Sequence, residues 1–365
     1  MVKTTPIACE TCVTPYPDEG TPYRCPRCGG AFDWMVAFPW QSPSRELLPG
    51  GIWRWQKSFG LPQLGDPVSL GEGNTPLIPD IVGGQQVYFK LESLNPTGSY
   101  KDRASSILTT FLRSRAVTDA VEDSSGNAGA SIAAYTARAG IHARVFVPES
   151  ASGPKRRQIE IYGAELVPVS GPRSAAAEAV ASEAAAGAVY ASHAWMPFGM
   201  AGIATIAYEL FEQLGQIPGT VIAPAGHASL VLGILRGFKA LQKAKQFDRM
   251  PVIIAVQSSA CAPVWAAWNQ LPPPVVEGGT LAEGVRVLKP VRITALINEL
   301  DRDRDLVLAF DDDQIRAARS KLARQGIDVE PTSALAWCGL VASGKKLPEP
   351  IVLVLTGSGL KYEGN

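Results

Sequence analysis

The sequence predicts an α/β fold with two doubly wound domains whose sheets are mostly parallel, preceded by a small zinc ribbon. Short β-rich runs alternate with helical runs over most of the chain, which is typical of parallel sheets covered by helices on both faces. The length of 365 residues favours two or three domains, each with a sizeable core. Two pairs of cysteines near the N-terminus account for the ribbon.

The alternation gives a definite order of elements. The β-rich runs predict strands at 87–91, 120–123, 143–147, 165–169, 189–192, 220–223, 252–256, 306–309 and 351–355. The helical runs predict helices at 101–116, 127–139, 154–162, 173–186, 200–214, 228–244, 312–325 and 332–342. We interpret 32–70 as an irregular connection packed on the body of the protein, because its Trp side chains need burial. The following residues, 70–77, form a loop that enters a strand.

The four N-terminal cysteines predict a structural metal site. Cys9, Cys12, Cys25 and Cys28 follow a C-x2-C-x12-C-x2-C pattern, in which each pair turns two sulfurs toward one point. Four thiolates form a closed tetrahedral zinc site with no open position for catalysis. The segment has too few apolar residues for a core, so the metal supplies its folding energy. Four unrelated buried thiols are a weaker alternative, as is a redox role, because neither pair lies between a strand and a helix.

Charge and hydropathy exclude several classes of partner. Lys and Arg together number 34, as do Asp and Glu, so no net charge attracts nucleic acid or a membrane surface. No apolar run approaches the roughly 20 residues that span a bilayer. The first six residues lack the apolar segment of a secretion signal. We therefore expect a cytoplasmic protein with reduced cysteines, in which Cys261 and Cys338 belong to the core.

One lysine stands at the start of a predicted helix. Asn95-Pro96-Thr97-Gly98 has the residues of a turn, and Lys101 follows it directly inside the helix that begins there. The positive end of the helix dipole disfavours a cation, so this amine loses its proton more readily. A neutral amine suits a Schiff-base lysine, whereas the alternative is a solvated surface lysine. This stretch alone favours neither.

Three further loops follow predicted strands and carry polar or small residues. The loop 123–129 offers hydroxyls, an amide and backbone N–H groups that suit a carboxylate, although a plain helix cap explains it equally well. The loop 223–230 allows close backbone approach and suits a phosphate, although it also fits an ordinary turn. The loop 355–360 follows the last strand. Ligands in such folds lie beyond the carboxyl ends of strands.

Together, these stretches resemble the fold-type II pyridoxal-phosphate enzymes, most closely the threonine synthase group. The motifs that carry the resemblance occur in the family's order, at 71–77, 94–103, 124–127, 330–334 and 355–357. The resemblance implies a tryptophan synthase β-like fold that follows a zinc ribbon at 1–32. It also implies a large cofactor-binding domain from 33–95 and 195–365, with a small mobile domain at 96–194.

The same resemblance implies a role for each site residue. Lys101 holds pyridoxal phosphate as a Schiff base and moves the substrate's protons, Asn127 hydrogen-bonds the ring oxygen, and Thr356 faces the ring nitrogen. The substrate carboxylate binds at a loop that comprises Ser124, Ser125 and Gly126, with Ala128 beside it. The cofactor phosphate binds at a loop that comprises Gly226, His227, Ala228, Ser229 and Leu230. The partners implied are a small amino-acid substrate and a second copy of the chain.

Several positions depart from the threonine synthase pattern. Ala128 and Gly129 offer no hydroxyl to a substrate phosphate, and the segment 192–205 is apolar where the group has polar and cationic residues. His193 is the titratable group in that segment, and we interpret it as an ordinary polar side chain at a strand end. The stretch 280–284 is similar to the serine/threonine dehydratases, and Ser358 replaces a usual histidine.

These departures leave three functions open. The first is conversion of O-phosphohomoserine and water to threonine and phosphate. The second is β-elimination or β-replacement on an amino acid like serine, threonine or phosphoserine. The third is a catalytically retired scaffold whose ribbon binds a protein or RNA, which the balanced charge and the presence of Lys101 disfavour.

Overall fold

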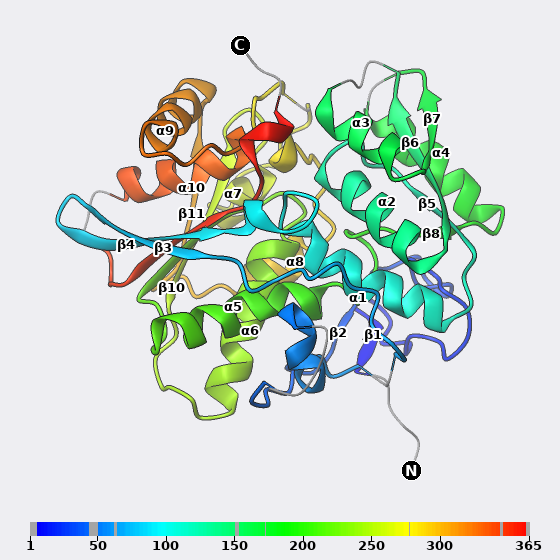
Figure 1. Ribbon diagram of the computed structural model, residues 1–365, viewed down its shortest axis with the longest axis horizontal. Coiled ribbons are helices and arrows are strands. Elements are labelled where there is room, and N and C mark those ends of the chain that lie inside the picture. Colours follow the sequence, from blue (N-terminus) through cyan, green and yellow to red (C-terminus); the bar gives the residue numbers. More distant parts are fainter. Residues whose placement is uncertain are drawn as a thin grey trace. The chain divides into compact units, whose positions relative to one another are not determined.

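The computed structural model of the protein describes residues 6–43, 50–61, 64–149, 153–171, 173–276, 278–343 and 346–362 (Figure 1). The chain forms two compact units. The first unit contains the described residues up to Glu72 together with Lys101–Gly202, and the second contains Gly73–Tyr100 together with Ile203–Tyr362. The chain therefore passes from the second unit into the first between Tyr100 and Lys101.

The sheet of the first unit has four parallel strands in the order β7-β6-β5-β8. Its strands are β5 (Asp119–Glu122), β6 (His142–Pro148), β7 (Glu165–Val169) and β8 (Val189–Tyr190). Its covering helices are α2 (Asn127–Ala139), α3 (Pro154–Ile161) and α4 (Arg173–Ala185). Alternate residues of β6 face opposite sides, so Val145 packs with α2 and α3 while Phe146 packs with α4. The helix α1 (Lys101–Ser114) lies along α2 and is buried from Asp102 to Leu112.

The sheet of the second unit has six strands in the order β11-β10-β9-β12-β4-β3, and only β3 is antiparallel to its neighbour. Its strands are β3 (Leu77–Val82), β4 (Gln85–Leu91), β9 (Thr220–Pro224), β10 (Val252–Ser258), β11 (Leu306–Phe310) and β12 (Ile351–Leu355). Figure 1 shows α9 (Asp312–Arg324) and α10 (Pro331–Ala342) on one face, with α6 (Ser229–Lys243) on the other. A Cβ at Gly339 of α10 would lie 2.8 Å from Ile222 and Val256 of the sheet, so this glycine lets the helix approach closely.

The helices and strands that the sequence predicts are present, each within a few residues of its expected bounds, and the α/β class with mostly parallel sheets is confirmed. Helix α5 (Met200–Leu214) matches its prediction at both ends. The strand β3 is predicted only as the strand that the loop 70–77 enters, without bounds. Three further kinds of element have no predicted range: the short strands β1 (Ile7–Cys9) and β2 (Phe32–Trp34), the helices α7 (Pro263–Trp268) and α8 (Ile293–Glu299), and the 3-10 helices η1 (Gly51–Ser58), η2 (Glu92–Leu94), η3 (Glu283–Val285) and η4 (Gly359–Lys361).

The connection that follows the ribbon is packed, as the sequence indicates. Trp34, Trp53 and Trp55 are buried, and the Trp34 indole N–H donates to the Pro197 carbonyl oxygen at 3.0 Å. The Val68 N–H donates to the Thr110 hydroxyl at 2.9 Å. The described parts of 33–72 therefore belong to the first unit, whereas the resemblance groups them with the cofactor-binding domain. The assignment of cofactor-binding and mobile domains stays a prediction, because the units reflect contacts and not roles.

The helices in the described residues do not indicate a membrane-spanning segment. In the parts of the chain that the structure describes, no helix has both the length and the apolar character needed to cross a bilayer.

Candidate functional site

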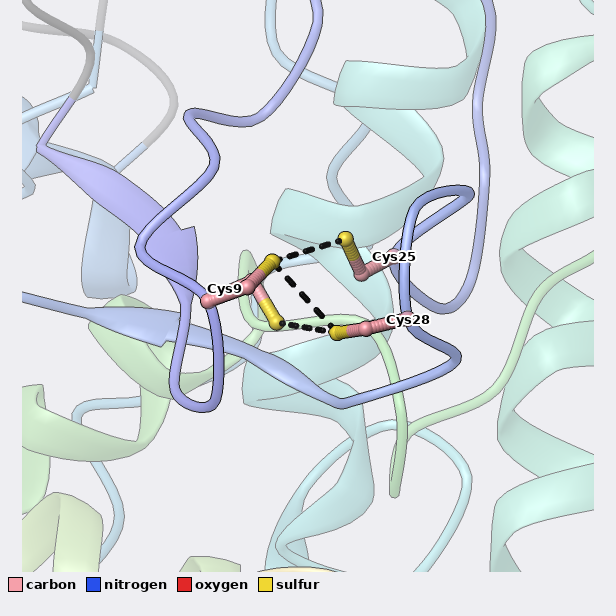
Figure 2. A group of neighbouring side chains, drawn as sticks. Cys9, Cys25 and Cys28 are labelled. Carbon is pink, nitrogen blue, oxygen red and sulfur yellow. Dashed lines mark hydrogen bonds between the residues drawn. The ribbon is translucent and has the colours of Figure 1, made fainter.

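The four N-terminal cysteines converge on one point of the first unit. Their sulfur atoms all lie within 4.8 Å of one another. The Cys9 and Cys28 sulfurs are 3.4 Å apart, as are those of Cys28 and Cys12, and Figure 2 shows the labelled side chains directed toward each other. Sulfur ligands about 2.3 Å from a tetrahedral zinc ion lie about 3.8 Å from one another. The donor set therefore fits a zinc ion, which would hold together a segment that has little core of its own.

Two similar turns present these sulfurs. The Val13 N–H donates to the Cys9 carbonyl oxygen at 3.0 Å, and the Gly29 N–H donates to the Cys25 carbonyl oxygen at 2.8 Å. Val13 and Gly29 both have positive φ, which closes each turn around its pair of cysteines.

The Thr14 side chain, followed by the Thr14 backbone, lowers the pKa of the Cys12 thiol to about 6 by hydrogen bonding. The pKa of the Cys28 thiol is instead raised to about 12, because the lowering effect of the Gly30 backbone is outweighed by hydrogen bonds with Cys12 and Cys9. Of these two ligands, Cys12 is therefore the one that ionises more readily to the thiolate, which is the form that binds metal.

We predict that the wild-type chain binds one zinc ion and that Cys25→Ser loses it. Three remaining thiolates leave one tetrahedral position open and reduce the metal's affinity steeply. Zinc content of the purified proteins, measured by mass spectrometry, checks this. The matched control is Cys261→Ser, which removes a buried thiol outside the cluster. Full zinc occupancy in Cys25→Ser would contradict the ligand set.

The helices that begin with Lys101 and Asn127 are joined by a chain of hydrogen bonds one turn below their starts. Ser131 donates to Asp102 Oδ1 at 2.6 Å, and the Ser105 and Ser131 hydroxyl oxygens are 2.6 Å apart. Ser105 lies four residues after Lys101, and Ser131 lies four residues after Asn127, so each serine shares a helix face with the site residue above it. The linked faces place the starts of α1 and α2 side by side within the first unit.

The chain of hydrogen bonds extends to His193. Its Nε2 lies 2.8 Å from the Ser105 hydroxyl oxygen. Since Ser131 gives its proton to Asp102, Ser131 accepts from Ser105, and Ser105 in turn accepts from the His193 Nε2–H. This order assigns the tautomer of His193. From the sequence we interpret His193 as an ordinary polar side chain. No local pattern reveals its hydrogen bond to Ser105 of α1, because the two residues are far apart along the chain.

We predict that Ser131→Ala lowers the free energy of unfolding by about 2 kcal/mol, because it leaves Asp102 and Ser105 short of a buried hydrogen bond. The matched control is Thr136→Val on the same helix, whose hydroxyl bonds only carbonyl oxygens of its own helix in the described contacts. We expect about 1 kcal/mol or less for that change. Urea unfolding of both variants measures the difference, and equal losses would show that the link between the helices adds nothing.

The loop between β5 and α2 folds back onto the helix that it precedes. The Gly126 N–H donates to the Ser124 hydroxyl at 3.2 Å, and the Ala130 N–H donates to the Gly126 carbonyl oxygen at 3.1 Å. A Cβ at Gly129 would lie 1.8 Å from the Ser124 carbonyl oxygen, so only glycine fits there. Ser124, Ser125, Gly126, Asn127 and Ala128 are half-buried and surround the start of α2. Backbone N–H groups and hydroxyls at a helix start form a suitable site for an anion.

A buried carboxylate fixes the start of the 71–77 motif. Glu72 is fully buried and accepts hydrogen bonds from the Trp53 indole at 3.0 Å and the Tyr135 hydroxyl at 2.7 Å. Ser69 and the Leu70 N–H donate to the same carboxylate. Burial, followed by the charges of Asp102 and Glu72, raises the pKa of Tyr135 well above its ordinary value, so its hydroxyl stays a donor. Glu72 thus ties the motif to α2, the helix that carries Asn127.

In the second unit, the loop that precedes α6 has the features of a phosphate site. A Cβ at Gly226 would lie 2.7 Å from the Gly284 carbonyl oxygen, so the glycine allows the two loops to meet. Ala228 adopts φ of +71°, a conformation that costs a residue other than glycine about 1 kcal/mol or more. The backbone N–H groups that open α6 point out of the helix start, where an anion is favoured. His227 and Leu230 lie on either side of this turn.

The hydrogen bonding of two buried hydroxyl groups indicates whether these residues fit pyridoxal phosphate. The Ser229 and Ser99 hydroxyls are buried and have no hydrogen-bond partner among the described residues of the chain. An unpartnered buried hydroxyl costs about 1–3 kcal/mol, which a bound anion would recover. Ser229 is the first residue of α6, so its hydroxyl and the helix N–H groups can serve one phosphate. The residues present fit the cofactor.

Thr356 follows β12, the neighbour of β9 in the same sheet, so its loop and the loop before α6 leave the same edge. Its hydroxyl lies 3.0 Å from that of Ser333 on α10, which also accepts from the Gly357 N–H at 2.9 Å. The Tyr100 N–H donates to the Thr356 carbonyl oxygen at 3.0 Å, and Lys101 is the next residue of the chain. Ser333 lies inside the 330–334 motif, although no role is predicted for it from the sequence.

Comparisons with known proteins identify the family of this chain. A family described as "Pyridoxal-phosphate dependent enzyme" matches residues 68–357. Threonine synthase of Methanocaldococcus jannaschii is 32% identical over 97% of this chain and 92% of its own length. Threonine synthase of Halalkalibacterium halodurans is 32% identical over 80% of this chain and 84% of its own length.

Two solved structures have a fold similar to that of this chain. The threonine deaminase of T.th. has a TM-score of 0.67 at 26% identity and covers 80% of this chain and 94% of its own. Maize serine racemase has a TM-score of 0.69 at 21% identity, over 78% of this chain and 88% of its own, and shares the fold. The chain therefore belongs to the family of pyridoxal-phosphate-dependent enzymes, with the fold-type II architecture.

Proposed function

We propose that this enzyme is a threonine synthase, which converts O-phosphohomoserine and water to threonine and phosphate. The observation that carries the proposal is the 32% identity to a threonine synthase over nearly the whole length of both chains. The proposal also explains why loops suited to a phosphate, a carboxylate and a reactive amine all follow strands or turns at helix starts. The small molecules implied are pyridoxal phosphate and a free amino acid.

Each site residue then has a chemical role. The cofactor, when bound, supplies an electron sink for the negative charge that develops on the substrate. Lys101 would hold it through Nζ, and the same amine would move protons at the substrate's α- and β-carbons. Asn127 donates to the ring oxygen, and Ser124, Ser125, Gly126 and Ala128 surround the substrate carboxylate. The loop that comprises Gly226, His227, Ala228, Ser229 and Leu230 would bind the cofactor phosphate, and the Thr356 hydroxyl would face the ring nitrogen.

A second candidate is β-elimination or β-replacement on serine, threonine or phosphoserine. Two observations favour it. Gly129 is packed against the Ser124 carbonyl oxygen, so no side chain there can offer a hydroxyl to a substrate phosphate. Threonine deaminase is 26% identical to this chain. A retired scaffold has less support, since the chain keeps Lys101 and the family's motifs in order.

Product analysis separates the two candidates. The purified holoenzyme is incubated separately with O-phosphohomoserine, L-serine and L-threonine, and threonine, phosphate and 2-oxo acid are measured. Threonine and phosphate released in equal amounts would support the first candidate. A 2-oxo acid from serine or threonine, with O-phosphohomoserine unchanged, would support the second and overturn the first. The cytoplasmic location and the homodimer remain expectations that cell fractionation and light scattering would address.

A further inference from the structure

The ribbon packs against the body of the first unit through aromatic side chains next to its cysteines. Tyr23 lies two residues before Cys25, and its ring meets that of Tyr190 edge-on with centroids 5.0 Å apart. The Arg24 guanidinium lies 4.7 Å from the Tyr23 ring centroid and 4.7 Å from that of Trp195. Tyr23 and Trp195 thereby join the hydrophobic cluster on the α4 face of the sheet.

A second contact fixes the same part of the ribbon, between Cys12 and Cys25. Tyr16 is buried, and its ring meets those of Phe111 on α1 and Phe198 with centroids 5.9 and 4.9 Å apart. Arg115 donates to the carbonyl oxygens of Pro17 at 3.2 Å and Gly20 at 3.4 Å. The ribbon thus contacts the rest of the first unit at two places, so a change in the fold of the ribbon alters the packing at both.

Tyr190 connects the ribbon to the loop that precedes α2. Its hydroxyl donates to Asp123 Oδ1 at 2.7 Å, and Asp123 directly precedes Ser124. Tyr190 is the last residue of β8, a two-residue edge strand that pairs with β5 through Val121. A two-residue strand makes few backbone hydrogen bonds with its neighbour, so these bonds alone hold its position weakly. The Tyr23 ring covers this strand and restricts the side chain that bonds Asp123.

We propose that the zinc ribbon is a brace that positions the loop 123–127 through Tyr23, Tyr190 and Asp123. Zinc folds the ribbon, the folded ribbon packs Tyr23 on Tyr190, and Tyr190 holds Asp123 at the entrance of the loop. Tyr23 and Tyr190 are positioning residues, because they act through Asp123. The inference that the braced loop binds the substrate carboxylate rests on the proposed function, whereas the brace itself does not.

Hydrogen exchange tests the brace without reference to any substrate. The full-length holoenzyme is compared with Tyr23→Ala and Tyr190→Phe, and deuterium uptake is measured in peptides that cover 122–130. We expect uptake there to be on the order of tenfold faster in both variants, because a buried hydrogen bond or its support is lost. Peptides from β6 should be unchanged. Faster exchange throughout the unit, or no change at 122–130, would overturn the proposal.

Matched variants separate positioning from loss of a buried group. Tyr23→Phe keeps the ring that covers Tyr190, and Tyr16→Phe removes a buried hydroxyl that has no partner among the described residues. Both should exchange as the wild type does, with zinc content unchanged in all four variants. The double variant Tyr23→Ala/Tyr190→Phe should be no faster than Tyr190→Phe alone, because both act on one path. Additive effects would overturn that path.

Removal of zinc and a kinetic split complete the test. A chelator should speed exchange at 122–130 in the wild type and add little in Tyr190→Phe. With the substrate that product analysis identifies, Tyr190→Phe should raise KM about tenfold and change kcat little, as expected for a loop that binds and does not react. Faster exchange with unchanged KM would keep the brace and refute the carboxylate role of the loop, so the two failures are distinguishable.

Discussion

Lys101→Ala yields a colourless protein that turns over about a thousandfold more slowly than the wild type or not at all. The wild-type holoenzyme is expected to be yellow, because a lysine-bound cofactor absorbs visible light. Lys101 is the first residue of α1 and directly follows Tyr100, which belongs to the second unit. Alanine cannot attach the cofactor and cannot move a proton, so both properties are lost together.

Two controls make this result specific. Lys243→Ala removes an exposed lysine in the last turn of α6 and should keep both colour and activity. Reduction of the wild type with borohydride should fix the cofactor on one peptide, which mass spectrometry identifies as the one containing Lys101. A yellow Lys101→Ala protein after saturation with pyridoxal phosphate, or a label on another lysine, would refute the assignment.

The parallel sheets were predictable because their strands and helices carry strong local signals. Strands β7 and β12 occur at the predicted residues, and the helices α2 and α5 begin and end as expected. The edge strand β3 was expected only as a strand entered from the preceding loop, because none of its residues is fully buried and it contains Pro79, which lacks a ladder donor. The three-residue strands β1 and β2 depend on pairing with each other, which no local pattern reveals.

The positions of the candidate site residues at helix starts were more predictable than the groups that support them. Glycines and hydroxyls in the motifs indicated anion sites, and the structure places them at helix starts. The supporting groups are ordinary residues in the sequence: Ser131 of α2, Ser333 of α10 and Tyr190 of β8 matter because of partners distant along the chain. Local periodicity cannot show such pairings, which depend on how the elements pack.

The 71–77 motif is a further example of what local sequence patterns cannot show. The sequence groups 71–77 as one stretch, yet Glu72 bonds Trp53 and Tyr135 in the first unit, while the Gly73 N–H donates to Asn95 at 2.9 Å in the second. Nearby, Lys90 and Glu209 form a buried ion pair in which Nζ and Oε2 are 2.6 Å apart. The other carboxylate oxygen of Glu209 accepts a hydrogen bond from the Asn74 N–H. The motif thus spans the boundary between the units, and its acidic residue is structural.

A methyl group at position 129 should have the second large effect. Gly129→Ala would bring its Cβ to 1.8 Å from the Ser124 carbonyl oxygen, a backbone atom that cannot move without carrying the loop with it. We expect the free energy of unfolding to fall by about 3 kcal/mol, as in overpacked cores, and the carboxylate site to lose its shape. Because Lys101 and the loop before α6 are untouched, the protein should remain yellow.

The matched control for stability is Gly126→Ala in the same loop. Its added Cβ would lie 3.7 Å from the Ser124 hydroxyl oxygen, which is ordinary contact, and the Gly126 φ of −101° suits any residue. Urea unfolding should therefore place Gly126→Ala near the wild type and Gly129→Ala well below it. A Gly129→Ala enzyme with unchanged stability and unchanged KM would mean that the loop does not keep this fold against α2. A colourless but stable Gly129→Ala enzyme would instead place the cofactor, and not the substrate carboxylate, against that loop.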